Sequence, residues 1–265
     1  MVRDDLVEVP ETDIFCRVER TRHAAPWIVF SNSLVTDLSI WDAQADALKD
    51  RFQVLRYDQR GHGRTSPGES APDMPRLAAD LHAVLDHFGI ERCTFVGLSM
   101  GVPTGLTAYG MRPERFGRLV LSDGQAKTAA TGAATWAGRI AFAKEHGMDG
   151  YAEDTARRWL QPDNAAGPKG EALRRMVAAT PLKGFIHGAT ALQDYDQEAV
   201  LRRIACPLLV IAGAEDGAMP SSMAATFGGV PGARVGIIPQ AGHVPNFEQP
   251  DAFNAVLLDF LGVGA

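Results

Sequence analysis

A serine between two glycines is the residue in this sequence best placed to do chemistry. It lies in GLSMG at residues 97–101, directly after the apolar run CTFVGL (93–98) and directly before a stretch, 101–111, that we expect to be helical. A G-x-S-x-G turn between a strand and a helix holds its serine on a strained bend with the hydroxyl exposed above the sheet. The glycines are expected to avoid collisions with the neighbouring strand and helix. Ser99 is therefore the candidate nucleophile.

His243 is the candidate base. A serine hydroxyl is a weak nucleophile at neutral pH and needs a base whose pKa lies near the working pH, which favours histidine. Of the seven histidines, His243 lies in a loop between the last expected strand, RVGIIP (234–239), and the last expected helix, 250–261. A ring in that loop can reach over the sheet toward Ser99. His62, in the glycine-containing segment DQRGHGRT, is expected to form part of a tight turn instead.

Two aspartates compete for the role of the acid that orients the histidine. Asp216 follows the apolar run PLLVIAG and lies between Ser99 and His243 in the chain, in the order nucleophile, acid, base. It could also simply cap the helix that includes PSSMAATF. Asp123, at the end of VLSD, also follows a strand and could reach the histidine. We favour Asp216.

Two backbone amides are expected to stabilise negative charge on a carbonyl oxygen attacked by Ser99. The first is the amide of Met100, at the start of the helix after the serine. The second should come from the loop FSNSLVTD after the first central strand, with Leu34 preferred and Ser33 as the alternative. Asn32 is expected to hold this loop by hydrogen bonds.

The elements that must position these residues alternate between strand and helix. Expected helices cover 38–51, 74–88, 101–111 and 250–261, and expected strands cover 27–31, 53–58, 93–98, 118–123, PLLVIAG ending at Gly213, and 234–239. This alternation predicts an α/β fold with a mostly parallel central sheet and helices on both faces. Residues 124–203 contain no strand-like run. We expect a single domain over 1–265 with a helical lid inserted at about 124–203, above the strand ends where ligands bind.

Composition narrows the possible partners. The net charge of −6 and the pI near 5.6 argue against nucleic acid, which is bound through clustered Lys and Arg, so we expect a small-molecule substrate. No apolar stretch is long enough to span a membrane, and the acidic first residues lack the pattern of a signal peptide, which makes the cytoplasm the expected location. The three cysteines have no CxxC or His neighbours, so we expect buried thiols and no metal site.

Four segments carry a resemblance to a known family: FSNSLVTDLSIWDAQ (30–44), LRYDQRGHGRTS (55–66), GIERCTFVGLSMG (89–101) and AGHVPNFEQP (241–250). With them the chain resembles the α/β-hydrolases over essentially its whole length, and more narrowly the 3-oxoadipate enol-lactonases of aromatic catabolism. The resemblance implies a triad of Ser99, Asp216 and His243. It also implies opening of a small unsaturated γ-lactone that bears a carboxylate, without a metal or organic cofactor.

Some residues depart from those lactonases. They usually continue the serine turn as SMGG, whereas Val102 and Pro103 follow Gly101 here, which is expected to alter the wall beside Ser99. The lid segments SDGQAK (122–127) and GFIHGATALQDYD (184–196) also differ. The alternatives on the same triad are a general carboxylesterase, a carbon–carbon bond hydrolase and a perhydrolase. A more distant one is a small-lactone receptor with slow turnover.

A substrate carboxylate buried under the lid needs a positive partner. Trp136 and Arg139 lie three residues apart in TWAGRIAFAKE, so on a helix they share a face and could offer an apolar wall and a guanidinium. The alternative for this pair is a surface arginine beside a tryptophan that packs the lid. Comparable candidates are Arg157 with Trp159, and the pair Arg174 and Arg175.

Overall fold

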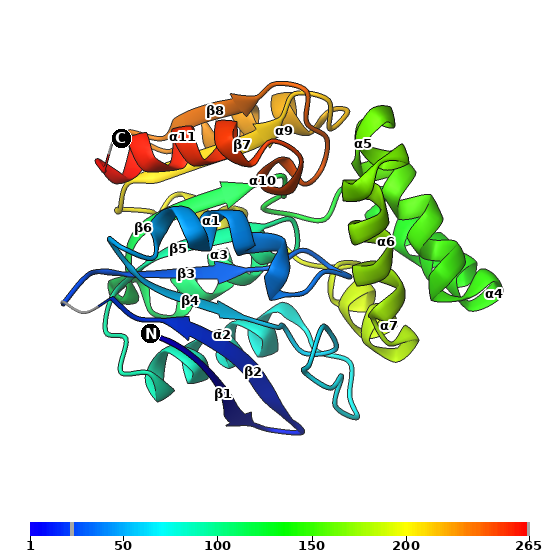
Figure 1. The fold of residues 1–265 in the computed structure, drawn as a ribbon, viewed down its shortest axis with the longest axis horizontal. Helices are drawn as coiled ribbons and strands as arrows, with labels where there is room; N and C mark the ends of the chain where they lie inside the picture. Colours follow the sequence, from blue (N-terminus) through cyan, green and yellow to red (C-terminus); the bar gives the residue numbers. More distant parts are fainter. Residues whose placement is uncertain (22–23, 264–265) are drawn as a thin grey trace.

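The structure is a computed structural model that describes residues 1–21 and 24–263. Within these residues eight strands form one sheet in the order β1-β2-β4-β3-β5-β6-β7-β8 (Figure 1). β2 pairs antiparallel with β1 and β4, and the other neighbouring strands pair in parallel. The strands are β1 (Val2–Val9), β2 (Thr12–Glu19), β3 (Trp27–Ser31), β4 (Gln53–Tyr57), β5 (Cys93–Leu98), β6 (Phe116–Ser122), β7 (Leu208–Gly213) and β8 (Arg234–Ile238).

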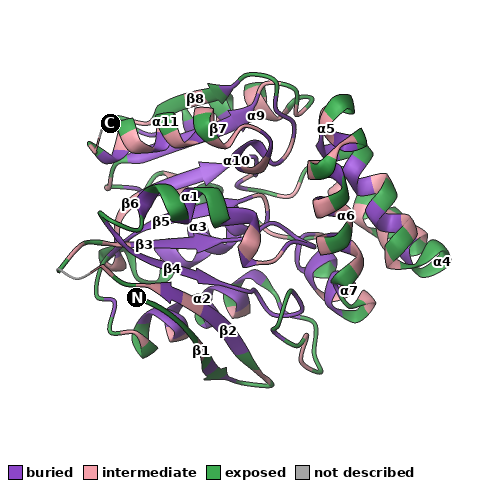
Figure 2. Cartoon of the chain, viewed as in Figure 1, coloured by how far each residue is buried: buried purple, intermediate pink, exposed green. Residues whose placement is uncertain are grey.

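The parallel strands β5 and β7 are buried along their whole length, which explains their continuous apolar sequences. Every residue of β4, β5 and β7 is buried, as expected for parallel strands covered on both faces (Figure 2). The mostly parallel α/β sheet expected from the sequence is therefore confirmed.

Helices cover both faces of this sheet. On one face, α1 and α11 enclose a core in which the Trp41 ring lies 4.9 Å from Phe30 and 6.1 Å from Phe253. On the other face, Leu81, Leu106 and Phe227 pack into a second core. The helices outside the lid are η1 (Leu38–Trp41), α1 (Asp42–Leu48), α2 (Met74–His87), α3 (Gly101–Met111), η2 (Pro113–Arg115), α9 (Met219–Phe227), α10 (Pro245–Glu248) and α11 (Pro250–Leu261).

The segment between β6 and β7 is helical, and we call it the lid. It comprises α4 (Gly132–Trp159), α5 (Pro162–Ala166), α6 (Pro168–Ala179), α7 (Leu182–Ala191) and α8 (Glu198–Leu201). The green and yellow-green helices of Figure 1 show α4 to α7 beyond the carboxyl ends of the parallel strands. In the lid segment of the described chain, the strand-like pairing is an isolated bridge between Lys127 and Asp196.

Some expectations at the level of single elements were wrong. The stretch 38–51 is not one helix, because it divides at Trp41 into η1 and α1. The Asp37 carboxylate accepts a hydrogen bond from the Ser39 amide and starts the first, tighter turn, in which Trp41 is fully buried. Cys16 and Cys93 are buried, but Cys206 is only partly so.

No helix within residues 1–21 and 24–263 combines the length and apolar character needed to cross a bilayer.

Candidate active site

The turn after β5 holds Ser99 in a strained conformation. Its φ is +52°, in the left-handed region that non-glycine residues rarely adopt, and its amide donates a 2.8 Å hydrogen bond to the Ser122 carbonyl. A Cβ at Gly97 would lie 2.5 Å from the Gly101 carbonyl oxygen, and a Cβ at Gly101 would lie 2.5 Å from that of Ser31. The glycines therefore allow the helix to start against the sheet, with Ser99 between them.

Ser99, His243 and Asp216 form one hydrogen-bonded chain. The His243 Nε2 lies 2.9 Å from the Ser99 Oγ, and the His243 Nδ1 lies 2.8 Å from the Asp216 Oδ2. With a proton on Nδ1 donated to the carboxylate, Nε2 is free to accept the serine proton. The three side chains come from the ends of β5, β7 and β8, which the sheet brings to one edge. This arrangement can generate a serine nucleophile at neutral pH.

Asp123, the rival for the acid role, has different partners. Its carboxyl accepts hydrogen bonds from the Gly213 amide at 2.8 Å and the Ser122 hydroxyl at 2.7 Å, and none of its hydrogen bonds among the described residues involves His243. Burial, and then the negative charge of Asp216, raise the pKa of Asp123 well above its usual value. Asp216 does not cap α9, because the residue at that position is Ala218 and no side chain caps the helix.

The triad opens into a cavity of about 510 Å³ between the sheet edge and the lid. Leu34 and Met100 line this cavity beside Ser99. Neither of their amides donates to a protein acceptor in the described part of the chain, so both are available to a bound oxygen. Ser33, the alternative to Leu34, is fully buried and does not line the cavity.

Asn32 holds this loop differently from what we expected. Its main-chain carbonyl accepts a 2.6 Å hydrogen bond from the Gln59 side chain. Its own buried side-chain amide has no hydrogen-bond partner among the described residues. The main chain, and not the side chain, therefore anchors the loop.

Comparisons with known proteins identify the family of this chain. Residues 26–250 match the family model described as the alpha/beta hydrolase fold. The chain belongs to the α/β-hydrolase family. It is 34% identical over 235 residues to 3-oxoadipate enol-lactonase 2 of Acinetobacter baylyi, and the match covers 86% of each chain. It is also 32% identical over 259 residues to the putative carbamate hydrolase RutD of Pseudomonas savastanoi pv. phaseolicola, and that match covers 94% of this chain and 98% of the relative.

Solved structures give the same result. The crystal structure of the enol-lactonase from Burkholderia xenovorans superposes on this hydrolase with a TM-score of 0.91 at 32% identity, covering 97% of this chain and 100% of that one. A hydrolase from Pseudomonas aeruginosa superposes with a TM-score of 0.91 at 35% identity, covering 98% of each chain. The chain therefore resembles several α/β-hydrolases along nearly its whole length.

The lid of the hydrolase carries Trp136 and Arg139 to the same cavity as Ser99. The Arg139 guanidinium lies over the Trp136 ring, 4.6 Å from its centroid, and pairs with no carboxylate of the described residues. Burial, and then the positive charge of Arg158, lower the pKa of Arg139 from its ordinary value. The cavity thus contains an unpaired cation whose charge is incompletely solvated.

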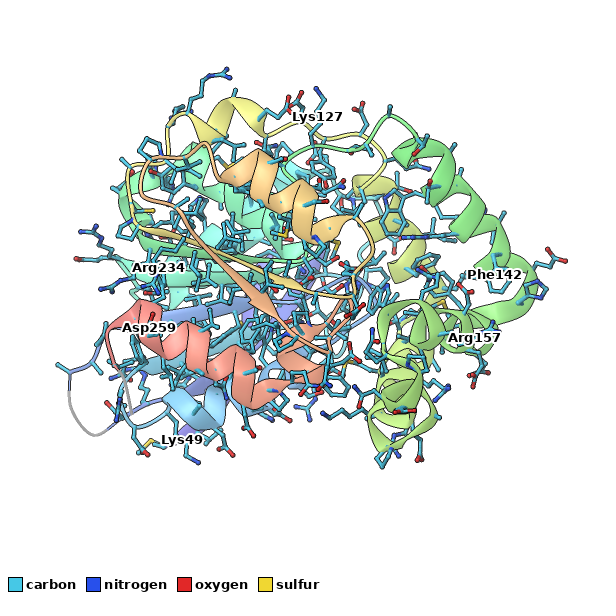
Figure 3. All side chains as sticks on the ribbon, turned by 90° about the horizontal axis from the view of Figure 1, so that it is seen from above. Lys49, Lys127, Phe142, Arg157, Arg234 and Asp259 are labelled. Atoms are coloured by element: carbon cyan, nitrogen blue, oxygen red, sulfur yellow. The ribbon has the colours of Figure 1, made fainter. Side chains whose placement is uncertain are left out.

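The other arginine candidates lie elsewhere. Arg157 projects from the lid with 70% of its side chain exposed (Figure 3), and Arg174 and Arg175 pair with Glu153 and Glu171. None of the three lines the cavity.

Two lid residues at the site were missed or only partly anticipated. Arg158 lines the cavity while paired with Asp154 at 2.6 Å, and nothing in the sequence distinguishes it from Arg157. Trp159, considered only as a companion of Arg157, places its ring 4.9 Å from the His243 ring.

The other residues singled out in the sequence, His62, Val102 and Pro103, do not line the cavity. His62 is buried, its Nδ1 lies 3.0 Å from the Arg60 carbonyl, and burial lowers its pKa to about 4. Val102 and Pro103 do not themselves line the cavity. They are buried in the first turn of α3, where Val102 packs against Gly124. Within residues 1–21 and 24–263, no group of three or more His, Cys, Asp and Glu could hold a metal ion.

Proposed function

We propose that this α/β-hydrolase opens a small, carboxylate-bearing lactone through a covalent acyl-enzyme on Ser99. The observation that carries the proposal is the hydrogen-bonded chain of Ser99, His243 and Asp216 at a cavity that also contains the unpaired Arg139. The relatives named as 3-oxoadipate enol-lactonases, at 30 and 34% identity, support a lactone related to theirs.

In the first half of the reaction, the Ser99 Oγ attacks the lactone carbonyl while His243 Nε2 takes the hydroxyl proton. Asp216 stabilises the resulting imidazolium. The amides of Met100 and Leu34 donate to the oxyanion. When the tetrahedral intermediate collapses, the ring C–O bond breaks and the ring oxygen takes the proton from His243. Because the leaving oxygen belongs to the same molecule, the acyl group on Ser99 retains every atom of the lactone.

In the second half, water attacks the acyl carbon and gives its proton to His243. Collapse returns that proton to the Ser99 oxygen and releases a carboxylic acid. If the ring oxygen is part of an enol ester, the product tautomerises to the ketone. One lactone and one water thus give one oxo acid, and the enzyme returns to its starting state.

Arg139 is the proposed receptor for the carboxylate that the substrate carries. A guanidinium can bind a carboxylate with two parallel hydrogen bonds. The attraction between the two charges is strongest where water is excluded. The Trp136 ring lies against the Arg139 guanidinium and orients it through the cation–π contact. The same ring offers a flat wall to the lactone ring of the substrate. This pair would favour an acidic substrate over a neutral one of the same size.

A carbamate hydrolase is the second candidate, because relatives named putative carbamate hydrolase RutD match at 28 to 32% identity. We expect wild-type protein to hydrolyse an acidic enol-lactone with a higher kcat/KM than p-nitrophenyl esters or alkyl carbamates of similar size. The measurement is initial rates on that panel, with Ser99→Ala protein as the blank for each compound. Preference for the carbamate would replace the lactone assignment, and absence of turnover on every compound would contradict hydrolysis of this class.

The role of Arg139 gives a separate prediction. Arg139→Met keeps most of the side-chain length and removes the charge, so kcat/KM for an acidic lactone should fall by about tenfold to a hundredfold, as for a lost charge-assisted hydrogen bond. The rate on the methyl ester of the same lactone should change little. Arg175→Met, an exposed lid arginine outside the cavity, is the matched control and should behave as wild type. Equal losses on both substrates would remove Arg139 from the carboxylate site.

A further inference from the structure

Glu248 is a buried carboxylate that the proposed reaction leaves without a role. It ends α10, five residues after His243, and its side chain is completely inaccessible to solvent. No ion pair among the described residues neutralises it. Lys169, the one nearby cation that bonds to this residue in the described chain, donates to its main-chain carbonyl and not to its carboxylate. A buried carboxyl group needs hydrogen-bond donors in place of water, and Glu248 has three.

Those hydrogen bonds join two separate parts of the molecule. Glu248 Oε2 accepts from the Gly242 amide at 2.5 Å, directly before His243. Glu248 Oε1 accepts from the Gln161 amide at 2.7 Å and from the Asn164 side chain at 2.9 Å, both in the lid where α4 passes into α5. One carboxylate therefore holds the lid against the loop of the histidine.

The same two segments also meet at the histidine itself. The His243 amide donates to the Trp159 carbonyl at 2.9 Å, and the rings of the two residues lie 4.9 Å apart. A Cβ at Gly242 would come within 2.2 Å of that same carbonyl oxygen, so the two backbones approach as closely as glycine allows. The main chain of His243 is thus fixed by the lid as well as by its own loop.

We propose that Glu248 is a positioning residue that uses the lid segment 159–164 as a fixed frame for His243. The proposal rests on the proposed role of His243 as the base. The lid then has a second task besides covering the cavity. It sets the distance between His243 Nε2 and Ser99 Oγ, and small errors in such a distance reduce the rate strongly.

Only a carboxylate can satisfy this arrangement. A glutamine at 248 has one oxygen and one NH2 group. Either the Gly242 amide or the Gln161 amide would then face another N–H donor, and the two segments would separate. Because the substitution preserves shape, its effect reports on the hydrogen bonds and not on a cavity.

The test is a double-mutant cycle between Glu248 and His243. Glu248→Gln should lower kcat on p-nitrophenyl acetate by about tenfold or more with KM nearly unchanged, because the defect lies in the alignment of the base. In a His243→Ala background the same substitution should lower the residual rate by less than about twofold, because a positioning residue has nothing left to position. Equal losses in both backgrounds, or an unchanged kcat in the first, would overturn the proposal. His243→Ala alone tests the base assignment, so the two failures are distinguishable.

A second variant covers the case in which Glu248→Gln does not fold. Gln161 has φ −60° and ψ 148°, and Leu160 before it is extended, so both suit a proline at 161. Gln161→Pro removes the main-chain donor to Glu248 together with the Gln161 side chain, and leaves the Asn164 donor in place. It should lower kcat severalfold with the same dependence on His243, and an unchanged kcat would contradict the proposal. Glu171→Gln, an exposed lid carboxylate paired with Arg175, is the control for loss of a lid charge and should match the parent protein in both backgrounds.

Discussion

Ser99→Ala and His243→Ala are each expected to lower kcat/KM on the preferred lactone by about three orders of magnitude or more. Ser99 supplies the only side-chain oxygen in contact with His243 Nε2 among the described residues, and without it water must attack the substrate directly. Without His243, the hydroxyl keeps its proton and attacks poorly. Because both residues serve the same step, the double variant should be hardly slower than either single one. Initial rates with purified proteins, checked by circular dichroism, measure this.

A histidine outside the site provides the control for these variants. His87 lies on the protein surface beside Asp5 and does not line the cavity of Ser99, so His87→Ala should retain wild-type kcat/KM. Retention of a tenth or more of the wild-type rate by either Ser99→Ala or His243→Ala would be incompatible with the acyl-enzyme mechanism. Multiplicative losses in the double variant would show that the two residues act in different steps.

The second large effect is expected at the acid. Asp216→Asn should leave the protein folded and lower kcat by about a hundredfold or more, because the amide can offer its NH2 group to His243 and so favour the wrong tautomer, and because it does not stabilise imidazolium. The expected difference lies in kcat and not in KM. Steady-state kinetics on the same lactone provide the measurement.

Asp123→Asn is the matched substitution at the neighbouring strand. Its carboxyl accepts from the Gly213 amide and the Ser122 hydroxyl and has no hydrogen bond to His243 among the described residues, and an asparagine keeps its shape and one accepting oxygen. Most of the activity should therefore remain. A larger loss for Asp123→Asn than for Asp216→Asn would move the acid of the triad to the end of β6.

Much of the fold could be predicted from sequence because the relevant signals are local. The strands β3, β5 and β7 are continuous apolar runs, and α11 was expected at its observed bounds because a proline begins it and its apolar residues recur on one face. The division of 38–51 into η1 and α1 was missed because it depends on a side-chain cap at Asp37 and on burial of Trp41, which periodicity does not reveal.

The residues proposed for the chemistry were named from motif and chain order, and the structure brings His243 within hydrogen-bond distance of both Ser99 and Asp216. The residues that support them were harder to predict from the sequence. Glu248 belongs to the segment AGHVPNFEQP, but its partners at 161 and 164 lie more than eighty residues away in the chain. Long-range contacts of this kind depend on how the lid docks on the sheet, and no local pattern encodes that.

Covalent labelling tests most directly whether Ser99 is the nucleophile. We expect a fluorophosphonate probe to attach a single phosphonyl group to the wild-type protein, and peptide mass spectrometry to locate it on Ser99. Labelling should be much slower in His243→Ala, because the probe requires the same activated oxygen, and absent in Ser99→Ala. Attachment to another residue, or labelling of Ser99→Ala at the wild-type rate, would contradict the nucleophilic role of Ser99.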